Sequence, residues 1–183
     1  GTGGKYLAWT NLQTILSLAA IPAIFAIGMH PTIVAGGIDL SVQGVASLVA
    51  VFVGLLLRNQ FNSNDLGMWI VPVAMVIGAV AGVVNGLLNA ALRIPSFIAS
   101  LGMGWILYGL AVFMGKAVNV PLLDTRIGDF ASANVLGVPQ IAIVAVVFTV
   151  VVQLFEDHTR FGRFTYAIGG DEVVARQAGV RVG

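Results

Sequence analysis

The sequence predicts an all-α fold, a polytopic transmembrane helical bundle with about five spans and a short cytoplasmic helix after them. Hydrophobic residues make up 58% of the 183 residues and charged residues only 9%, whereas an ordinary soluble domain is about one quarter charged. Five stretches contain no charged residue at all: 6–38, 40–57, 66–92, 94–115 and 130–155. Each can hold one crossing, because a helix of about 20 residues spans a hydrocarbon core of about 30 Å.

Helices are expected because lipid offers no partner for free backbone groups, and a run such as 71–88 is too long for a barrel strand. The chain therefore divides into a transmembrane region, 1–155, and a cytoplasmic loop, 156–183. The spans are predicted near 12–35, 42–57, 68–92, 96–115 and 138–155.

Basic residues give the orientation, since Lys and Arg collect in short cytoplasmic connections. The densest cluster lies in the tail, at Arg160, Arg163, Arg176 and Arg181. The tail and the turn at Arg93 should then be cytoplasmic, and 58–67, 116–137 and the N-terminus should lie outside. An outside N-terminus without an initiator Met suggests a missing upstream helix, so we expect a fragment of a longer chain.

Several classes of function find no support in the residues. The chain has no cysteine, which removes disulfides and thiol nucleophiles, and its net charge of +1 argues against nucleic acid as a partner. No metal-ligand spacing, phosphate-binding glycine loop or nucleophile with a base stands out. We therefore expect no catalytic residues, no metal and no cofactor, and any energy source must come from elsewhere.

Asp39 is an ionisable residue between two apolar runs, directly after Gly36 and Gly37. Glycines allow a broken or re-entrant segment there. The carboxylate could cap the helix that starts near 42 by accepting from N–H groups near Ser41 and Val42. It could equally mark a pathway or pivot inside the bundle, since a charge near hydrocarbon is costly. The two interpretations are compatible.

Three further patterns fall within predicted spans. His30 and Pro31 interrupt the first span, where a proline kink is favoured over a proton relay. The third carries Gly78, Gly82 and Gly86 every four residues, which predicts close helix packing. Asn85 and Asn89 share its cytoplasmic end and could bond across helices or line a polar path.

The tail segment "GGDEVVARQAG", 169–179, reads as a short helix. Asp171 is its predicted N-cap, Glu172 lies in its first turn and Gly179 is its C-terminal stop. A helix of about two turns is marginal alone. We therefore expect it to dock on the other helices or on a partner protein.

Three stretches together are similar to one known family: "AGGIDLSVQG" at 35–44, "GVVNGLLNAALRIPSFIASLGMG" at 82–104 and "FGRFTYAIGGDEVVARQAGVRV" at 161–182. They resemble the membrane permease of bacterial ABC importers for ribose, xylose and related sugars. The sequence departs from the usual family pattern at Gln43, Asp171, Val174 and Val180, where Gly, Asn, Ala and Ile are expected.

The resemblance implies a multi-pass subunit of the bacterial inner membrane that moves a monosaccharide. Its implied partners are a second permease subunit, as a homodimer, a cytoplasmic ABC ATPase, a periplasmic sugar-binding protein and membrane lipid. It implies that the tail couples to the ATPase through Arg163, Gly169, Gly170, Asp171, Glu172, Arg176 and Gly179. Because sugars are neutral and rich in hydroxyls, the candidates for the translocation path are small polar residues: Ser41, Gln43, Asn85, Ser96 and Ser100. Asp39 is the candidate for a pivot or gate.

Two other functions stay open from the residues alone. An ATP-independent secondary transporter or channel could bind a coupling ion at Asp39 in a broken helix. A structural membrane subunit could use the glycines and asparagines for assembly only. The first predicts transport without an ATPase. The second predicts that Asp39→Asn and Asn85→Ala alter assembly but leave transport unchanged once the complex has assembled.

Overall fold

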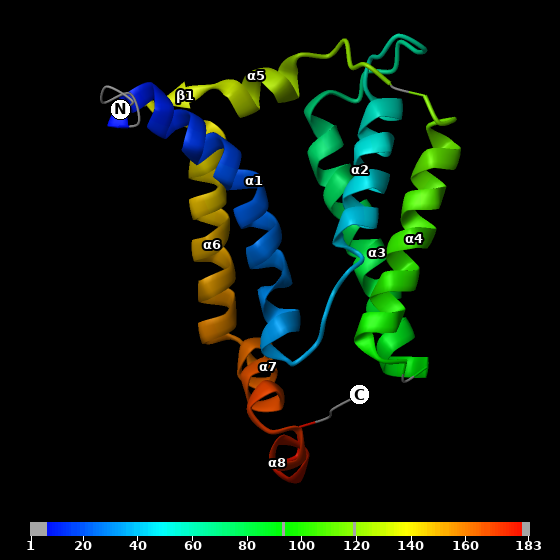
Figure 1. Ribbon diagram of the computed structural model, residues 1–183, viewed down its shortest axis with the longest axis vertical. Coiled ribbons are helices and arrows are strands. Elements are labelled where there is room, and N and C mark those ends of the chain that lie inside the picture. The colour runs from blue at the N-terminus through cyan, green and yellow to red at the C-terminus, as the bar shows by residue number, and fades with distance from the viewer. Residues whose placement is uncertain (1–6, 93, 119, 181–183) are drawn as a thin grey trace, which may run out of the picture. The chain divides into compact units, whose positions relative to one another are not determined.

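The computed structural model describes residues 7–92, 94–118 and 120–180 of the chain, so Arg93 and Arg181 lie outside the described residues (Figure 1). Helices dominate these residues, which confirms the predicted all-α fold. The long helices are α1 (Trp9–Val34), α2 (Val42–Leu56), α3 (Ile70–Leu92), α4 (Ser96–Met114) and α6 (Gln140–His158). The shorter ones are η2 (Gly67–Trp69), α5 (Arg126–Ser132), α7 (Arg160–Gly170) and α8 (Glu172–Gln177).

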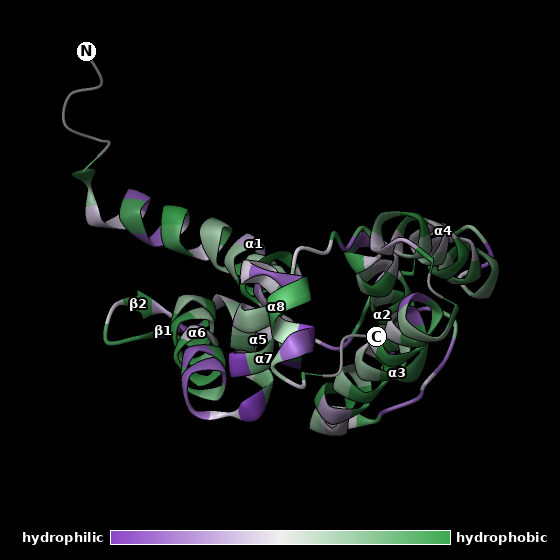
Figure 2. Ribbon diagram, turned by 90° about the horizontal axis from the view of Figure 1, so that it is seen from below, coloured by the Kyte–Doolittle hydropathy of each residue, from purple (hydrophilic) through white to green (hydrophobic). Residues whose placement is uncertain are grey.

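Four helical segments are long and apolar enough to cross a membrane, judged by length and composition: α1, η2 with α3, α4 and α6. Helix α2 is apolar but has only 15 residues, or roughly 22 Å at 1.5 Å per residue. In Figure 2 these helices are mostly hydrophobic, and hydrophilic segments gather at helix ends and around α7. The described part of the chain therefore has four candidate spans and one shorter apolar helix.

The chain forms two compact units, which we describe separately. One comprises 1–36 and 127–182, and the other comprises 37–126. In the first unit α1 packs on α6 around Ala20, Ala142 and Ala145. A hairpin of β1 (Asn134–Val135) and β2 (Val138–Pro139) precedes α6. Gln13 of α1 fastens this hairpin by donating to the Gly137 carbonyl at 2.7 Å.

The second unit packs α2 against α4 and α3. Its buried core consists of Leu48, Ala81, Met103, Leu107 and Ala111. Many large apolar side chains on the other helix faces are exposed, such as Val76, Trp105 and Ile106. An apolar outer surface of this kind suits lipid or a partner protein rather than water.

His30 and Pro31 do not break the first helix, because α1 continues through Pro31 and ends at Val34; the kink expected at Pro31 stays a prediction. Proline removes only its own N–H from the helix, and the Pro31 carbonyl still accepts from Ala35 N at 3.0 Å. Gly36, which follows the C-cap residue Ala35, has a φ of +81°, a conformation that favours glycine.

The glycine face of α3 has few neighbours in the described part of the chain. A Cβ at Gly78 would lie 3.9 Å from Cγ1 of Val45, and one at Gly82 or Gly86 would meet nothing within 4 Å. Close packing at this face therefore stays a prediction.

Candidate functional site

The link between α1 and α2 is an irregular segment, 37–41, whose backbone is held by side chains of α4. The N–H of Ile38 donates to Oγ of Ser96 at 3.1 Å. The hydroxyl of Ser100, which is 1% exposed, donates to the carbonyl of Ile38 at 3.1 Å. Backbone groups outside a helix need such partners where water is scarce. Both serines are thereby fixed beside the segment.

Asp39 organises the end of this segment. Its Oδ1 accepts from the backbone N–H of Ser41 at 2.8 Å and from the Ser41 hydroxyl at 2.6 Å. The prediction that Asp39 is the N-cap of α2 is wrong, because the N-cap position is Ser41. An Asp side chain readily reaches the N–H two residues ahead, so it forms a turn that leads into the helix.

Asn85 of α3 extends this polar group. Its Nδ2 lies 3.4 Å from Oγ of Ser41, and its buried Oδ1 has no hydrogen-bond partner among the described residues. A buried acceptor without a donor is costly, and a hydroxyl group could satisfy it. Asn89 does not join this group, because its Nδ2 donates to the Ile94 carbonyl at 2.7 Å, in the turn before α4.

Helices α2 and α4 cross backbone to backbone at Gly44 and Gly104. A Cβ at Gly44 would overlap the Gly104 carbonyl, and one at Gly104 would lie 3.0 Å from the Leu40 carbonyl. Beside the crossing is a cavity of about 360 Å³. It is lined by Leu40, Gln43, Gly44, Leu101, Gly104, Trp105 and Tyr108. Sequence reasoning missed the crossing and the aromatic lining.

Five of the six residues predicted for the path or gate thus meet at one place, the polar cluster. It consists of Asp39, Ser41, Asn85, Ser96 and Ser100, gathered around 37–41. The sixth, Gln43, lines the neighbouring cavity. Apart from Asp39 the cluster offers neutral hydroxyl and amide groups. Such groups can exchange hydrogen bonds with a neutral, hydroxyl-rich solute.

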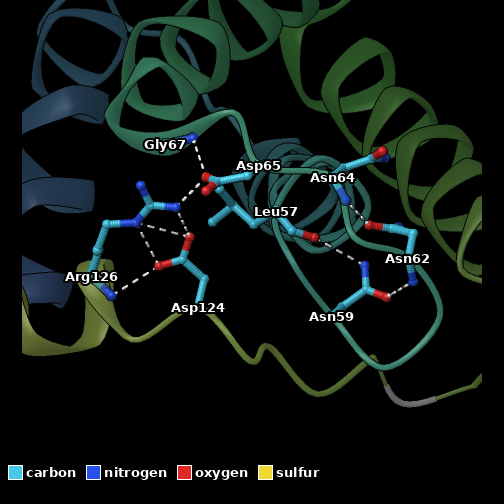
Figure 3. Close-up of polar contacts among 8 residues, drawn as sticks. All are labelled: Leu57, Asn59, Asn62, Asn64, Asp65, Gly67, Asp124 and Arg126. Carbon is cyan, nitrogen blue, oxygen red and sulfur yellow. Dashed lines mark hydrogen bonds and ion pairs between the residues drawn. The ribbon is translucent and has the colours of Figure 1, made fainter.

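The loop after α2 is built around Asn59, which is 3% exposed. Its side-chain amide donates to the Gly54 and Leu57 carbonyls at 2.6 and 3.2 Å, and its Oδ1 accepts from Phe61 N and Asn62 N. Figure 3 shows the contacts with Leu57 and Asn62. A second loop pairs with it, since Leu123 N donates to the Arg58 carbonyl at 2.9 Å. The two loops therefore form one ordered surface.

Arg126 fastens the same two loops by bonding Asp65 of one and Asp124 of the other (Figure 3). Hydrogen bonds from the Arg126 side chain and backbone N–H lower the pKa of Asp124. The hydrogen bonds to Asp124 and Asp65 raise the pKa of Arg126. Sequence reasoning identified solvated loops here but not this ionic network.

In the tail, the predicted short helix is present as α8. Oδ1 of Asp171 accepts from Val173 N at 2.8 Å and from Val174 N at 3.0 Å, so Asp171 is the N-cap. Gly179 follows with φ of +85°, and Arg176 bonds Glu172 at 2.6 Å. The caps predicted from sequence are confirmed.

Helix α7, which sequence reasoning missed, precedes α8 and carries Arg163, Gly169 and Gly170. A Cβ at Gly169 would overlap the Val34 carbonyl of α1, whereas one at Gly170 would meet nothing within 4 Å. Arg163 is exposed. Of these three residues, Gly169 alone is placed against another helix.

A buried carboxylate lies where α1, α6 and α7 meet. The Glu156 side chain is 2% exposed, and its Oε1 lies 3.1 Å from Nδ1 of His30. The Tyr166 hydroxyl donates to Oε2 at 3.5 Å. Partial desolvation and the neighbouring Glu156 carboxylate raise the pKa of Tyr166. His30 therefore has a structural partner that its position in the sequence did not reveal.

Over the residues that the structure describes, no group of three or more His, Asp or Glu side chains could hold a metal ion.

Comparison with known proteins gives a consistent result. Residues 11–183 match the model of a family described as "Branched-chain amino acid transport system / permease component". The galactose/methyl galactoside import permease protein MglC of Escherichia coli K12 is 34% identical over 97% of this chain and 57% of its own length. The ribose import permease protein RbsC of the same strain is 33% identical over 97% of this chain and 56% of its own.

The inner membrane ABC transporter permease protein YjfF, also of that strain, is 33% identical over 91% of this chain. The chain spans about half the length of the curated relatives it matches. No solved structure matches.

Proposed function

Because the chain belongs to the family of permease components of the branched-chain amino acid transport type, we propose that it is part of a permease subunit of a bacterial ABC importer. The proposed cargo is a monosaccharide of the ribose, xylose or galactose kind. The proposed place is the bacterial inner membrane, with 1–155 as the spanning region and 156–183 as the cytoplasmic loop.

The observation that carries the choice of cargo is the polar cluster around 37–41. It gathers hydroxyl and amide groups from the segment 37–41, α3 and α4 beside a cavity whose lining includes Gln43, Trp105 and Tyr108. A sugar needs neutral donors and acceptors, and aromatic rings can cover its apolar faces. The single carboxylate, Asp39, already accepts two hydrogen bonds from Ser41. This chemistry suits a neutral polyol better than an ion.

The partners follow from the same proposal. The subunit has no catalytic site of its own, and a cytoplasmic ATPase docks on α8 and hydrolyses ATP. The paired loops fastened by Arg126 face a periplasmic sugar-binding protein. A second copy of the permease completes the path, and the exposed apolar helix faces contact that copy and lipid.

Purification of the native-length protein from its own host in mild detergent tests this proposal. We expect mass spectrometry to find an ABC ATPase in stoichiometric amount. A protein that is recovered alone, yet still moves sugar in liposomes, would instead be a secondary transporter. A protein that assembles with partners but moves nothing would be a structural subunit.

A further inference from the structure

Helix α7 lies with its backbone directly against two other helices. A Cβ at Gly162 would overlap the backbone carbonyl of Glu156 in α6, and one at Gly169 would overlap the carbonyl of Val34 in α1. The two glycines are seven residues apart, so they lie on one face of α7, separated by about 10 Å along its axis. Contacts between backbones leave little room for sliding, because no flexible side chain separates them.

The Glu156 carboxylate joins the same three helices from inside. It belongs to α6, and its two oxygens meet His30 of α1 and Tyr166 of α7. The rings of His30 and Tyr166 also contact each other edge to face, with centroids 6.5 Å apart. A buried carboxylate is costly without polar partners. Separation of any two of these helices would therefore remove a partner from Glu156.

Helix α7 continues into α8 without a linker. Asp171 is both the C-cap of α7 and the N-cap of α8, with its N–H bonded to the Ala167 carbonyl at 3.2 Å. Helix α1, which contacts α7, is followed directly in the sequence by the segment that carries Asp39. A displacement of α8 would therefore act on α7 and, through the contacts above, on α1.

We propose that Glu156 is a positioning residue which, with His30, Tyr166 and the glycine contacts of α7, makes α1, α6 and α7 move as one body when α8 is displaced. This inference rests on the proposed function, in which α8 receives the movement of the ATPase. Glu156 touches neither ATP nor sugar in this account. Its role is to keep ATP hydrolysis coupled to the movement of α1.

The test uses the assembled importer, with the native-length permease and its ATPase, reconstituted in liposomes. Labelled ribose and galactose serve as probes, and the readout is sugar taken up per ATP hydrolysed, with bound ATPase measured in parallel. The variants are Glu156→Gln and Gly169→Ala. Their matched controls are Asp157→Asn, an exposed carboxylate bonded to Gln153 within α6, and Gly28→Ala in α1, which has open space around it.

We expect Glu156→Gln and Gly169→Ala to keep the ATPase bound and hydrolysing, while uptake per ATP falls on the order of tenfold, as changes along a coupling element can produce. The two controls should stay close to the wild type. Tyr166→Phe removes one hydroxyl from a half-exposed side chain and should show a smaller fall in uptake per ATP. If Glu156→Gln and Gly169→Ala do not assemble with the ATPase, the uptake per ATP of Tyr166→Phe tests the proposal. The double variant His30→Gln/Glu156→Gln should fall no further than Glu156→Gln alone, because both changes break one contact.

Uptake per ATP equal to that of the controls in every assembled variant, with an active wild type, would overturn this inference alone. A wild type without ATP-dependent uptake would overturn the proposed function, and the inference with it.

Discussion

Asp39 and Ser41 are joined twice: one carboxylate oxygen accepts from both the N–H and the hydroxyl of Ser41, at 2.8 and 2.6 Å. The same hydroxyl lies 3.4 Å from Nδ2 of Asn85. A substitution at Asp39 that reorients the Ser41 hydroxyl therefore also alters its contact with Asn85 of α3. This relationship makes Asp39 both part of a turn and part of the candidate path.

Asp39→Asn separates these two roles. The amide oxygen of Asn can still accept from the Ser41 N–H, so we expect normal insertion and a loss of stability below about 1 kcal/mol. We expect sugar uptake to fall severalfold, because the charge that orients the Ser41 hydroxyl is gone. Normal uptake by Asp39→Asn would defeat the gate role and leave only the turn.

The crossing of α2 and α4 predicts a sharp contrast between glycines. Gly44→Ala forces a methyl group onto the Gly104 carbonyl, and the backbone cannot move away easily, so we expect a loss of about 1–3 kcal/mol. Gly102→Ala and Gly109→Ala on α4 have nothing within 4 Å and should be neutral or slightly stabilising. Thermal unfolding in detergent measures the difference. Equal melting temperatures for Gly44→Ala and Gly102→Ala would contradict the crossing.

The cap of α8 predicts how the tail binds its partner. Asp171→Ala removes the acceptor for two backbone N–H groups and should destabilise α8 by about 1 kcal/mol. Because so short a helix is marginal, we expect about fivefold weaker association with the ATPase. Asp171→Asn keeps an acceptor and serves as the control. Unchanged binding by Asp171→Ala would show that the ATPase does not need α8.

The loops joined by Arg126 predict a dependence on pH. The pKa of Asp124 is lowered below its ordinary 3.8, so folding favours its ionised form. Its contribution to stability is complete above pH 3.8 and disappears as the pH falls through the lower, folded-state pKa. We expect Leu123 N to be protected from hydrogen exchange, relative to an unstructured chain, at neutral pH and to lose this protection only in strong acid.

Asp124→Asn should weaken this protection already at neutral pH, whereas Asp129→Asn in α5 should leave it unchanged. Rapid exchange at Leu123 in the wild type at neutral pH would contradict the pairing of the loops.

The sequence predicted the features that depend on local pattern. The five long helices follow from charge-free stretches, and α8 follows from Asp171 and Gly179 at its ends. Pairings between distant residues were not predictable. His30 and Glu156 are 126 positions apart, and the sequence around either residue does not indicate that the other is its partner.

Glycine was the least readable residue type. Gly162 and Gly169 lie in α7, where the backbones of Glu156 and Val34 leave no room for a Cβ, and the sequence alone did not show this. The regular spacing of Gly78, Gly82 and Gly86 suggested packing on α3, which stays a prediction, while the crossing at Gly44 and Gly104 has no such spacing to announce it. Which glycines meet another helix depends on tertiary packing, which spacing alone does not determine.

The most direct test of the account is uptake of labelled ribose and galactose by proteoliposomes that contain the native-length permease, its co-purified ATPase and the sugar-binding protein. We expect uptake with hydrolysable ATP on the ATPase side, and none with a non-hydrolysable analogue or without the ATPase. Equal uptake in the absence of ATP and ATPase would contradict it and identify a secondary transporter or channel.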